Sequence, residues 1–560
     1  MDGPIRRSSG DGGFTLVFFA LAIVALMGIA ALVVDLGYWY LHANRIQRAA
    51  DSAALAGVVY MPGDTGQATT VADEVAASNG FTTGVSVITQ VQDPSLNAHQ
   101  LKVSITDPGV PTFFAKVFGI DSITETRSST AEYLPPVPLG SAENSFGTGD
   151  LPLGLGNPTN IWAAVNGYCT SKENGDEFLS GFDATFNGSS FDCPANGDTL
   201  SAPATANFEY TPSGYTYDIE TPDQTPGGFV QSPLTVAAYD PSYNPGGCPS
   251  GGETPDNSIG QSGTQITTTF TLYYAPDPIN PPSAVNKMWT DTFATNDPGS
   301  CGQWVELGNG NGNVNGNGGG IPAGADNGTY QLVVATQADQ PNSDGTNAYG
   351  LEVYPAGSPF SRCSTIPTVA WYSTTCPIIQ GQSALSVYVN SSSSMGTFYL
   401  ANIDSTYDNK TMDIDLFDPG EGDHYIQILD PDGNPVPFDY TTIDACSSSP
   451  PYPPSPHVGS TDCAGGPGIQ FPQTTILGTS AAGTFNGQSV PDVLDVSGTI
   501  KPPTGEESAS EFNDRHLQLS VTVPPGTSGW WQIVYYSNSQ VSDRTTWTVS
   551  LSGSPIHLVP

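Results

Sequence analysis

An apolar stretch from Phe14 to Val34 most constrains what this chain of 560 residues can fold into, because it contains no charged residue and no proline. A helix of this length just spans a hydrocarbon layer of about 30 Å. No helix breaker follows before Pro62 and Gly63, so we expect one helix that continues well past the apolar part. At 1.5 Å per residue this helix would be roughly 70 Å long, and more than half of it would stand outside a membrane.

Beyond the apolar stretch, the expected helix carries a narrow stripe of mostly small side chains at alternating spacings of four and three residues. The stripe consists of Trp39, Ala43, Ile46, Ala50, Ala53 and Gly57. Such a stripe suits close packing of another element against the helix. Two interpretations stay open, namely packing against similar helices of other subunits and packing against a small sheet of the same chain.

Three segments in a fixed order carry a resemblance to a known family. The apolar stretch is followed by VDLG at residues 34–37 and by RAADSAALAG at residues 48–57. This combination resembles the N-terminal segment of the TadG-like (TadE/TadG) proteins of Flp, or tight adherence, pilus assembly. The resemblance continues weakly through VPTFFAKVFG at residues 110–119, so it covers about residues 12–133. It implies a non-catalytic, membrane-anchored component of a pilus assembly or secretion system, which contacts other pilus assembly or pilin-like subunits through its N-terminal helix.

The start of the apolar stretch also resembles the cleavage junction of type IV prepilins, where a peptidase cuts before a phenylalanine. The junction here is Gly13-Phe14. The prepilin pattern has glutamate at the fifth mature position, whereas this chain has Phe18. We therefore expect an uncleaved anchor, and a processed pilin beginning at Phe14 is the alternative.

The flanking charges predict the orientation of the anchor. Arg6 and Arg7 precede it, and the first cation after it is Arg45. The positive-inside rule then places residues 1–13 in the cytoplasm as a short tail, with residues 14–34 as a single-pass transmembrane helix. All residues after the helix would be extracytoplasmic.

All eight cysteines lie in the part expected outside the cell. They are Cys169, Cys193, Cys248, Cys301, Cys363, Cys376, Cys446 and Cys463. An even number in an oxidising compartment indicates up to four disulfides, and we expect nearest-neighbour pairing among the connectivities that the count allows. Zinc is the alternative, but the chain contains no CxxC pair.

The chain is strongly acidic, with 14 Lys and Arg against 54 Asp and Glu and a net charge of −40. This balance argues against nucleic acid as a partner and against an anionic membrane surface. Abundant Gly, Pro, Ser, Thr and Asn fit short strands joined by many turns. We predict a mainly β protein after the N-terminal transmembrane helix. Residue pattern and family resemblance together suggest that residues 35–133 form a long helix on a small sheet, the broad α+β plan of pilin-like proteins.

An internal duplication predicts the organisation of the rest. LTVAAYDP at residues 234–241 matches MDIDLFDP at 412–419, and FTLYYAPD at 270–277 matches YIQILDPD at 425–432. GTYQLVV at 328–334 matches GWWQIVY at 529–535, and both are followed by a strand ending in Gly-Ser-Pro. We infer two homologous β-sandwich modules, residues 155–360 and 384–560, with linkers at 134–154 and 361–383.

Acidic residues crowd two neighbouring turns of the second module. They are Asp418, Glu421, Asp423, Asp430 and Asp432. Oxygen ligands at this density suit calcium, but the glycine at 433 comes too early for an EF-hand loop. In so acidic a chain, solvated turn carboxylates are the favoured interpretation, and we expect neither a metal nor a cofactor.

The sequence contains no recognisable catalytic motif among its six histidines and its serines, such as HExxH or GxSxG, so we expect no enzyme. The alternative function is an exported surface adhesin or glycan-binding protein that uses a TadG-like anchor and contacts surface glycans or a host. Trp162, Trp304 and Trp371 would stack on sugars in that case, although tryptophans of β-sandwiches are more often buried.

Overall fold

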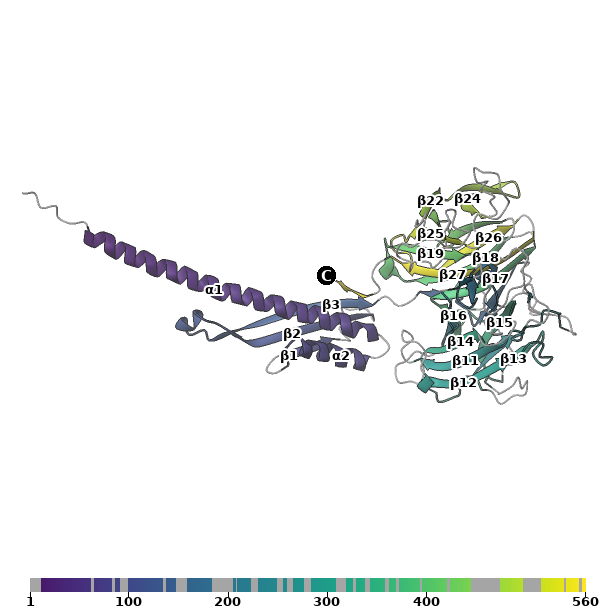
Figure 1. Ribbon diagram of the computed structural model, residues 1–560, viewed down its shortest axis with the longest axis horizontal. Coiled ribbons are helices and arrows are strands. Elements are labelled where there is room, and N and C mark those ends of the chain that lie inside the picture. Colours follow the sequence, from purple (N-terminus) through teal and green to yellow (C-terminus); the bar gives the residue numbers. More distant parts are fainter. Residues whose placement is uncertain are drawn as a thin grey trace, which may run out of the picture. The chain divides into compact units, whose positions relative to one another are not determined.

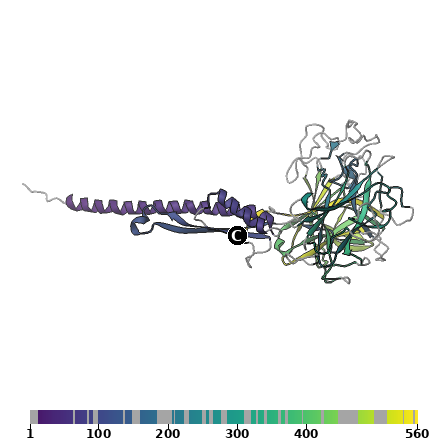
Figure 2. The same cartoon turned by 90° about the horizontal axis from the view of Figure 1, so that it is seen from below.

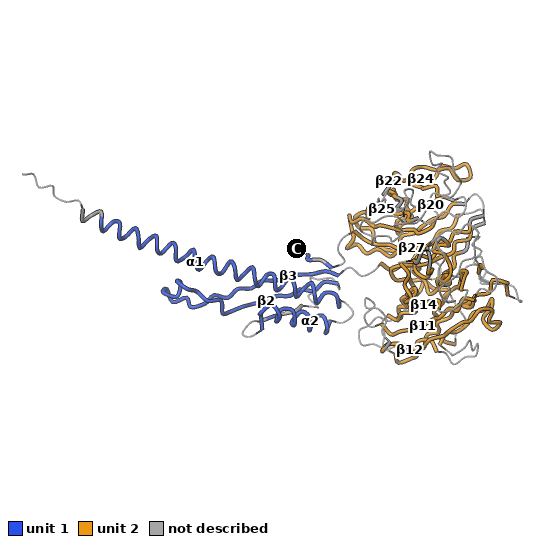
Figure 3. Tube along the Cα trace, in the orientation of Figure 1, with its two compact units in different colours: residues 1–135, 554–560 blue, residues 136–553 orange. Residues whose placement is uncertain are grey.

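The computed structural model describes residues 12–559 with gaps. Outside the described residues lie 1–11, 62–64, 83–85, 91–98, 134–136, 148–158, 184–204, 208, 223–229, 249–254, 259–264, 276–283, 309–318, 326–328, 338–342, 358–361, 369–371, 393–394, 420–423, 445–473, 497–514, 538–539, 553–555 and 560. The chain forms two compact units, coloured blue and orange in Figure 3. Unit 1 comprises residues 1–135 and 554–560, and unit 2 comprises residues 136–553.

Unit 1 is a long helix on a small antiparallel sheet (Figures 1 and 2). Its elements are α1 (Gly12–Gly57), η1 (Val58–Tyr60), α2 (Thr65–Ser78), β1 (Ser86–Gln90), β2 (Gln100–Pro111), η2 (Ala115–Phe118), β3 (Ser122–Tyr133) and β28 (Ile556–Val559). The strand order is β1-β2-β3-β28, and α1 contacts β2, β3 and α2. The last strand comes from the C-terminal end of the chain, so unit 2 is inserted between two neighbouring strands of unit 1.

Small side chains bring α1 and α2 close together. Ala50 and Ala53 of α1 and Ala68 and Ala72 of α2 are fully buried. At Gly57 an added Cβ would lie 2.6 Å from the carbonyl oxygen of Ala68 and 2.6 Å from Cδ2 of Leu101. The glycine that ends the stripe is therefore required by close packing.

The N-terminal part of α1 is exposed. Among the described residues, the helix from Leu16 to Tyr60 is long and apolar enough to cross a membrane, and its most apolar window has no buried residues. Large apolar side chains from Leu16 to Val34 are exposed to solvent in the isolated chain. This helix and the β-rich remainder confirm the expected fold class.

Unit 2 contains two sheets of 11 strands each. The first sheet has the order β13 (Trp304–Glu306), β10 (Leu234–Tyr239), β15 (Thr346–Pro355), β6 (Thr159–Asn166), β17 (Ala384–Ser392), β27 (Gln540–Leu551), β19 (Thr411–Phe417), β25 (Arg515–Thr522), β21 (Asp439–Asp444), β22 (Thr474–Thr479), with β5 (Ser145–Phe146) paired to β15. The second has the order β12 (Lys287–Phe293), β11 (Thr268–Ala275), β14 (Thr329–Thr336), β9 (Tyr215–Glu220), β16 (Ile378–Gln382), β4 (Pro138–Leu139), β18 (Met395–Ile403), β26 (Gly529–Ser537), β20 (His424–Leu429), β24 (Gln488–Asp495), β23 (Ala481–Phe485). A separate pair joins β7 (Phe182–Asp183) and β8 (Thr205–Ala206).

Aromatic side chains join the two sheets in the core. The hydroxyl of Tyr217 on β9 lies 3.1 Å from that of Tyr349 on β15. The rings of Tyr535 on β26 and Trp547 on β27 stack with centroids 6.4 Å apart. All four side chains are buried, so the core of unit 2 lies between the sheets.

The strand order is symmetrical about the pair β6–β17. Outward from this pair the first sheet reads β6-β15-β10 on one side and β17-β27-β19 on the other, and the second sheet places β9-β14-β11 opposite β18-β26-β20. The matched sequence segments occupy equivalent places. Asp240 and Asp418, which follow β10 and β19, are both fully buried with positive φ angles of 46° and 58°. The internal duplication remains our proposal, and these equivalences support it.

The two halves of unit 2 each contribute strands to both sheets. This arrangement differs from the expected pair of separate modules joined by linkers. Residues 134–154, expected to be a linker, contain β4 and β5, and residues 361–383 contain β16. β28, expected in the second module, pairs with β3 of unit 1. These strands are only two to five residues long, so their sequences carry little alternation.

Two disulfides in the described part of the chain join cysteines that are neighbours in the sequence. Cys248 is bonded to Cys301 and Cys363 to Cys376. Cys169 is also disulfide-bonded. Cys193, Cys446 and Cys463 lie outside the described residues.

Candidate functional site

The candidate site of unit 1 is the junction at which α1 leaves its apolar stretch. The carboxylate of Asp35 is buried and accepts hydrogen bonds from three successive backbone N–H groups at the end of the β2–β3 hairpin. Oδ1 accepts from Phe113 (2.8 Å), and Oδ2 accepts from Phe114 (3.0 Å) and Ala115 (2.7 Å). These N–H groups belong to the first residue of the short helix η2, Ala115, and to the two residues before it, so a carboxylate is the acceptor that suits them.

The hairpin end that Asp35 holds is a closed turn, residues 112–121, which we call the hairpin tip. The N–H of Thr112 donates to the carbonyl of Asp121 (3.2 Å), and the Thr112 hydroxyl donates to the carbonyl of Ile120. Gly119 ends η2 with a φ of 82°, a conformation that favours glycine. The tip therefore has a defined shape before any partner binds.

A second polar contact lies farther along α1. Nε2 of His42 is 2.9 Å from Oδ2 of Asp107 on β2, and both side chains are largely buried. The ring of Tyr38 packs edge-on against Phe113, with centroids 5.1 Å apart. The helix thus contacts the hairpin at two successive positions along its length.

The predicted stripe is covered by the chain itself. Ala43, Ile46, Ala50 and Ala53 are buried, Gly57 packs on α2 and β2, and Trp39 is half-buried. Of the two open interpretations, the structure contains the packing on the small sheet of the same chain. The outer face of α1 instead exposes Leu36, Tyr40 and Leu41.

The candidate calcium ligands do not gather in the described structure. Asp418 is fully buried, whereas Asp430 lies in an exposed turn and accepts from the N–H groups of Asp432 and Asn434 (3.0 and 2.8 Å). Glu421 and Asp423 lie outside the described residues. The Asp430 carboxylate therefore accepts hydrogen bonds within its own exposed turn.

Unit 2 contains a buried ionic cluster that sequence reasoning missed. Nδ1 of His516 on β25 lies 3.1 Å from Asp415 of β19, and its Nε2 lies 4.0 Å from Glu177. Nζ of Lys172 lies 3.2 Å from Glu209. The ligand atoms of Glu177, Glu209 and His516 are close enough to share a metal ion, but Lys172 already supplies a cation at this place.

Burial and neighbouring charges alter the affinity of this cluster for protons. Burial raises the pKa of Glu177 to about 8, opposed by His516. Burial alone would lower the pKa of His516, but the carboxylates of Asp415 and Glu177 outweigh it and raise that pKa to about 9. The backbone N–H of Glu177 donates to the hydroxyl of Thr546, 369 positions later in the chain. No local sequence motif predicts contacts between segments that are so far apart in the chain.

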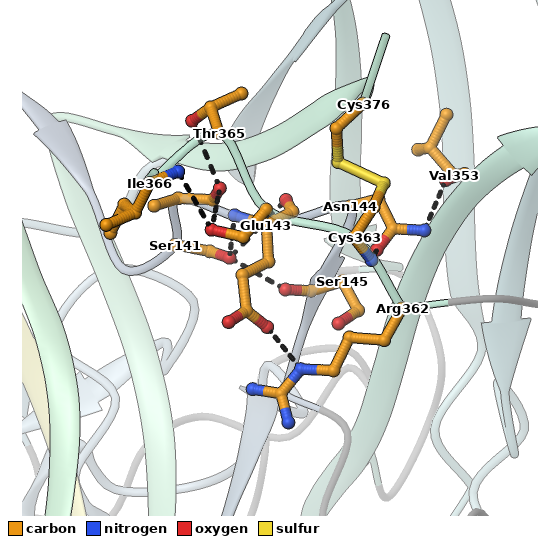
Figure 4. A network of polar contacts seen from close by, with 12 residues as sticks. Ser141, Glu143, Asn144, Ser145, Val353, Arg362, Cys363, Thr365, Ile366 and Cys376 are labelled. Carbon is orange, nitrogen blue, oxygen red and sulfur yellow. Dashed lines mark hydrogen bonds and ion pairs between the residues drawn. A yellow bond between two sulfur atoms is a disulfide. The ribbon is translucent and has the colours of Figure 1, made fainter. Parts of the chain in front are cut away.

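A disulfide-closed segment holds the chain where it enters unit 2 (Figure 4). Arg362 forms an ion pair with Glu143 (2.6 Å), and the N–H of Cys363 donates to the Asn144 side chain (2.8 Å). Asn144 in turn donates to the carbonyl of Val353 on β15 (3.0 Å). Residues around the Cys363–Cys376 disulfide thus fix the start of unit 2 to its first sheet.

The tryptophans proposed for sugar stacking are mostly covered. Trp162 is buried and stacks on Tyr239 with centroids 5.9 Å apart, and Trp304 is half-buried against the same tyrosine. Trp371 lies outside the described residues. Trp162 is therefore not exposed for stacking on a sugar, because its side chain packs in an aromatic row across β13, β10, β6 and β17.

Comparison with known proteins finds a similarity in the helical part of unit 1, which includes Asp35 but not the hairpin tip. Residues 12–76 match the family model described as putative Flp pilus-assembly TadE/G-like. The match confirms the resemblance for these residues and covers α1 and most of α2. No curated protein matches the chain.

Solved structures add only a remote alignment. The VP2 subviral particle of infectious bursal disease virus aligns at 11% identity, covering 77% of this chain and 83% of that chain, with a TM-score of 0.08. A mutant VP2 protein of the same virus aligns at 11% identity over 72% and 78%, also with a TM-score of 0.08. At such TM-scores the alignments carry no structural argument.

Proposed function

We propose that this protein is a non-catalytic, single-pass membrane component of an Flp-type pilus assembly or secretion system, with unit 2 as a large extracytoplasmic domain. One observation carries the proposal. The TadE/G-like match at residues 12–76 coincides with a helix whose first half is apolar and exposed and whose second half is packed on α2. An exposed apolar helix of this length is stable in a bilayer and unfavourable in water.

Two features support the proposed orientation. Arg6 and Arg7 precede the apolar stretch, and no cation follows until Arg45. Disulfides in unit 2, such as Cys248–Cys301, fit an oxidising compartment outside the cytoplasm. In this proposal residues 1–13 are cytoplasmic.

The proposed contact with other subunits uses the outer face of α1. The stripe from Ala43 to Gly57 is buried within the chain, so it is not free for a partner. Leu36, Tyr40 and Leu41 are 51%, 70% and 62% exposed and lie just past the apolar stretch. A pilin-like helix that packs on this face would cover apolar surface without disturbing unit 1.

Deletion of the gene in a cell that makes Flp pili tests the proposal. We expect loss of pili in electron micrographs, and recovery when the full chain is restored. Restoration with Leu41→Asn should remain defective at normal protein level, whereas the matched control Arg45→Gln, an exposed polar position one turn later, should restore pili. Normal pili and normal adherence in the deletion strain would contradict the proposed function.

A further inference from the structure

The hairpin tip carries a cluster of large apolar side chains that face solvent. Val117 and Phe118 are 83% and 86% exposed, and Phe113, Phe114 and Ile120 are about half exposed. Five such side chains within eight residues are unusual on a surface that meets only water. The tip is also held in shape by the Asp35 carboxylate, so this exposure belongs to a defined structure.

Successive contacts along α1 locate the tip relative to the apolar stretch. Leu101 of β2 lies next to Gly57, Asp107 pairs with His42, and the tip binds Asp35. The hairpin therefore runs along α1 toward the apolar stretch and ends level with the residue that follows Val34. The views in Figures 1 and 2 agree that the β2–β3 hairpin extends along α1.

We propose that the hairpin tip inserts into the interfacial layer of the same membrane that α1 spans. This inference rests on the proposed membrane anchor, because the apolar surface of the tip continues that of the helix at the level where the helix leaves the hydrocarbon. Phenylalanine, valine and isoleucine favour the boundary between headgroups and acyl chains, and the exposed Lys116 can extend its ammonium to the headgroups.

A second membrane contact has a mechanical consequence. A single helix can rotate about its axis, but a helix with an attached, inserted tip presents one fixed side to the membrane plane. Asp35 couples the two contacts, because its carboxylate joins the helix directly to the backbone of the tip. The outer face with Tyr40 and Leu41 is then held in one direction for its partners.

Photocrosslinking of the full chain in vesicles tests the inference. Benzoylphenylalanine replaces one residue at a time in protein reconstituted with phosphatidylethanolamine and phosphatidylglycerol that carry radiolabelled acyl chains. The positions are Phe118 in the tip, Leu26 in the apolar stretch, and Val285 of unit 2, a matched exposed apolar control (92% exposed). All three side chains are exposed, so the substitutions leave the core intact.

The inference predicts lipid adducts at Phe118 comparable to those at Leu26 and at least about tenfold above Val285. Adducts at Leu26 with none at Phe118, or with protein adducts at Phe118, would overturn the inference and leave the anchor standing. Absence of lipid adducts at both positions would overturn the anchor as well. Equal labelling of Phe118 and Val285 would also overturn the inference about the hairpin tip, because the lipid contact would not be specific.

Discussion

Asp35 is the first charged residue after the apolar stretch, and its carboxylate is buried against the hairpin instead of being solvated. Sequence patterns marked it as part of VDLG but did not indicate the backbone N–H donors that bind its carboxylate, which lie about 80 positions later in the chain. A carboxylate that accepts from three backbone N–H groups at a helix start satisfies donors that would otherwise lack partners. This explains physically why an acidic residue stands at this point of the chain.

Replacing Asp35 with Asn should loosen the hairpin tip. The amide keeps one acceptor oxygen and loses the negative charge, so hydrogen exchange at residues 113–115 should become faster by on the order of tenfold. Asp121→Asn is the matched control, because Asp121 is exposed at the same tip and lies 4.0 Å from Lys116, and it should change the exchange by less than about twofold. Mass spectrometry of exchanged peptides measures both. Equal effects of the two substitutions would contradict the role of Asp35.

Replacing Gly57 with Ala should destabilise unit 1. The added Cβ would meet Ala68 and Leu101 at 2.6 Å, and such overpacking costs about 1–3 kcal/mol. Gly37→Ala in the same helix has no atom within 4 Å of the new Cβ, so it should stabilise the helix by about 0.5–1 kcal/mol. Denaturation followed by hydrogen exchange of β2 and β3 measures both effects. A stable G57A protein would contradict the close packing of α1 on α2.

At the scale of elements, long periodic segments were predictable and short ones were not. The apolar stretch and the stripe indicate their element directly, because each pattern extends over many residues. β4, β5 and β28 have two, two and four residues, and their pairing depends on distant strands. The stripe itself predicted burial correctly but not its partner, since small side chains pack equally well on a neighbouring subunit or on α2.

Removal of the two described disulfides should destabilise unit 2, and the disulfide that closes the longer loop should have the larger effect. Cys248–Cys301 spans 53 positions and Cys363–Cys376 spans 13. Chain entropy then predicts losses of about 4 and about 3 kcal/mol on double substitution to alanine. Urea denaturation followed by tryptophan fluorescence measures these losses. A larger loss for the shorter loop would contradict the entropic explanation and indicate that the segment at Arg362 dominates.

At the scale of the whole molecule, the sequence of unit 2 is inserted into that of unit 1. The chain leaves unit 1 after one strand and re-enters it at the strand next to it. β3 ends at Tyr133, and β28 pairs with it from Ile556 onward. A sequence analysis that proceeds from one domain to the next does not find this arrangement, because the four residues IHLV complete a sheet whose neighbouring strand, β3, ends more than 400 residues earlier. The ionic cluster of unit 2 was missed for the same reason.

The ionic cluster predicts how the stability of unit 2 depends on pH. His516 has a pKa of about 9 in the fold against 6.5 unfolded, and burial raises that of Glu177 to about 8. Both groups bind protons more tightly when folded. The stabilisation from Glu177 is present below pH 4.5 and is lost as the pH rises through 8, and that from His516 is present below pH 6.5 and is lost as the pH rises through 9. We expect His516 alone to cause a decrease on the order of 3 kcal/mol between pH 6.5 and 9.

Urea denaturation at several pH values tests this dependence, and tryptophan fluorescence reports on unit 2 because only Trp39 of the eight tryptophans lies outside residues 136–553. The His516→Gln protein should lose the part of the decrease that His516 contributes, since the neutral amide cannot take up a proton. An unchanged slope in H516Q would show that other groups cause it.

The central claim, that α1 spans the membrane with its N-terminus in the cytoplasm and unit 2 outside, is tested most directly by protease accessibility. Cells carrying the full chain with an epitope at the N-terminus are treated with protease after any outer envelope layer is opened. We predict that unit 2 is digested while the epitope remains protected on a membrane-bound fragment until the membrane is dissolved. Protection of unit 2 together with loss of the epitope, or release of the whole chain by alkaline washing, would contradict the account.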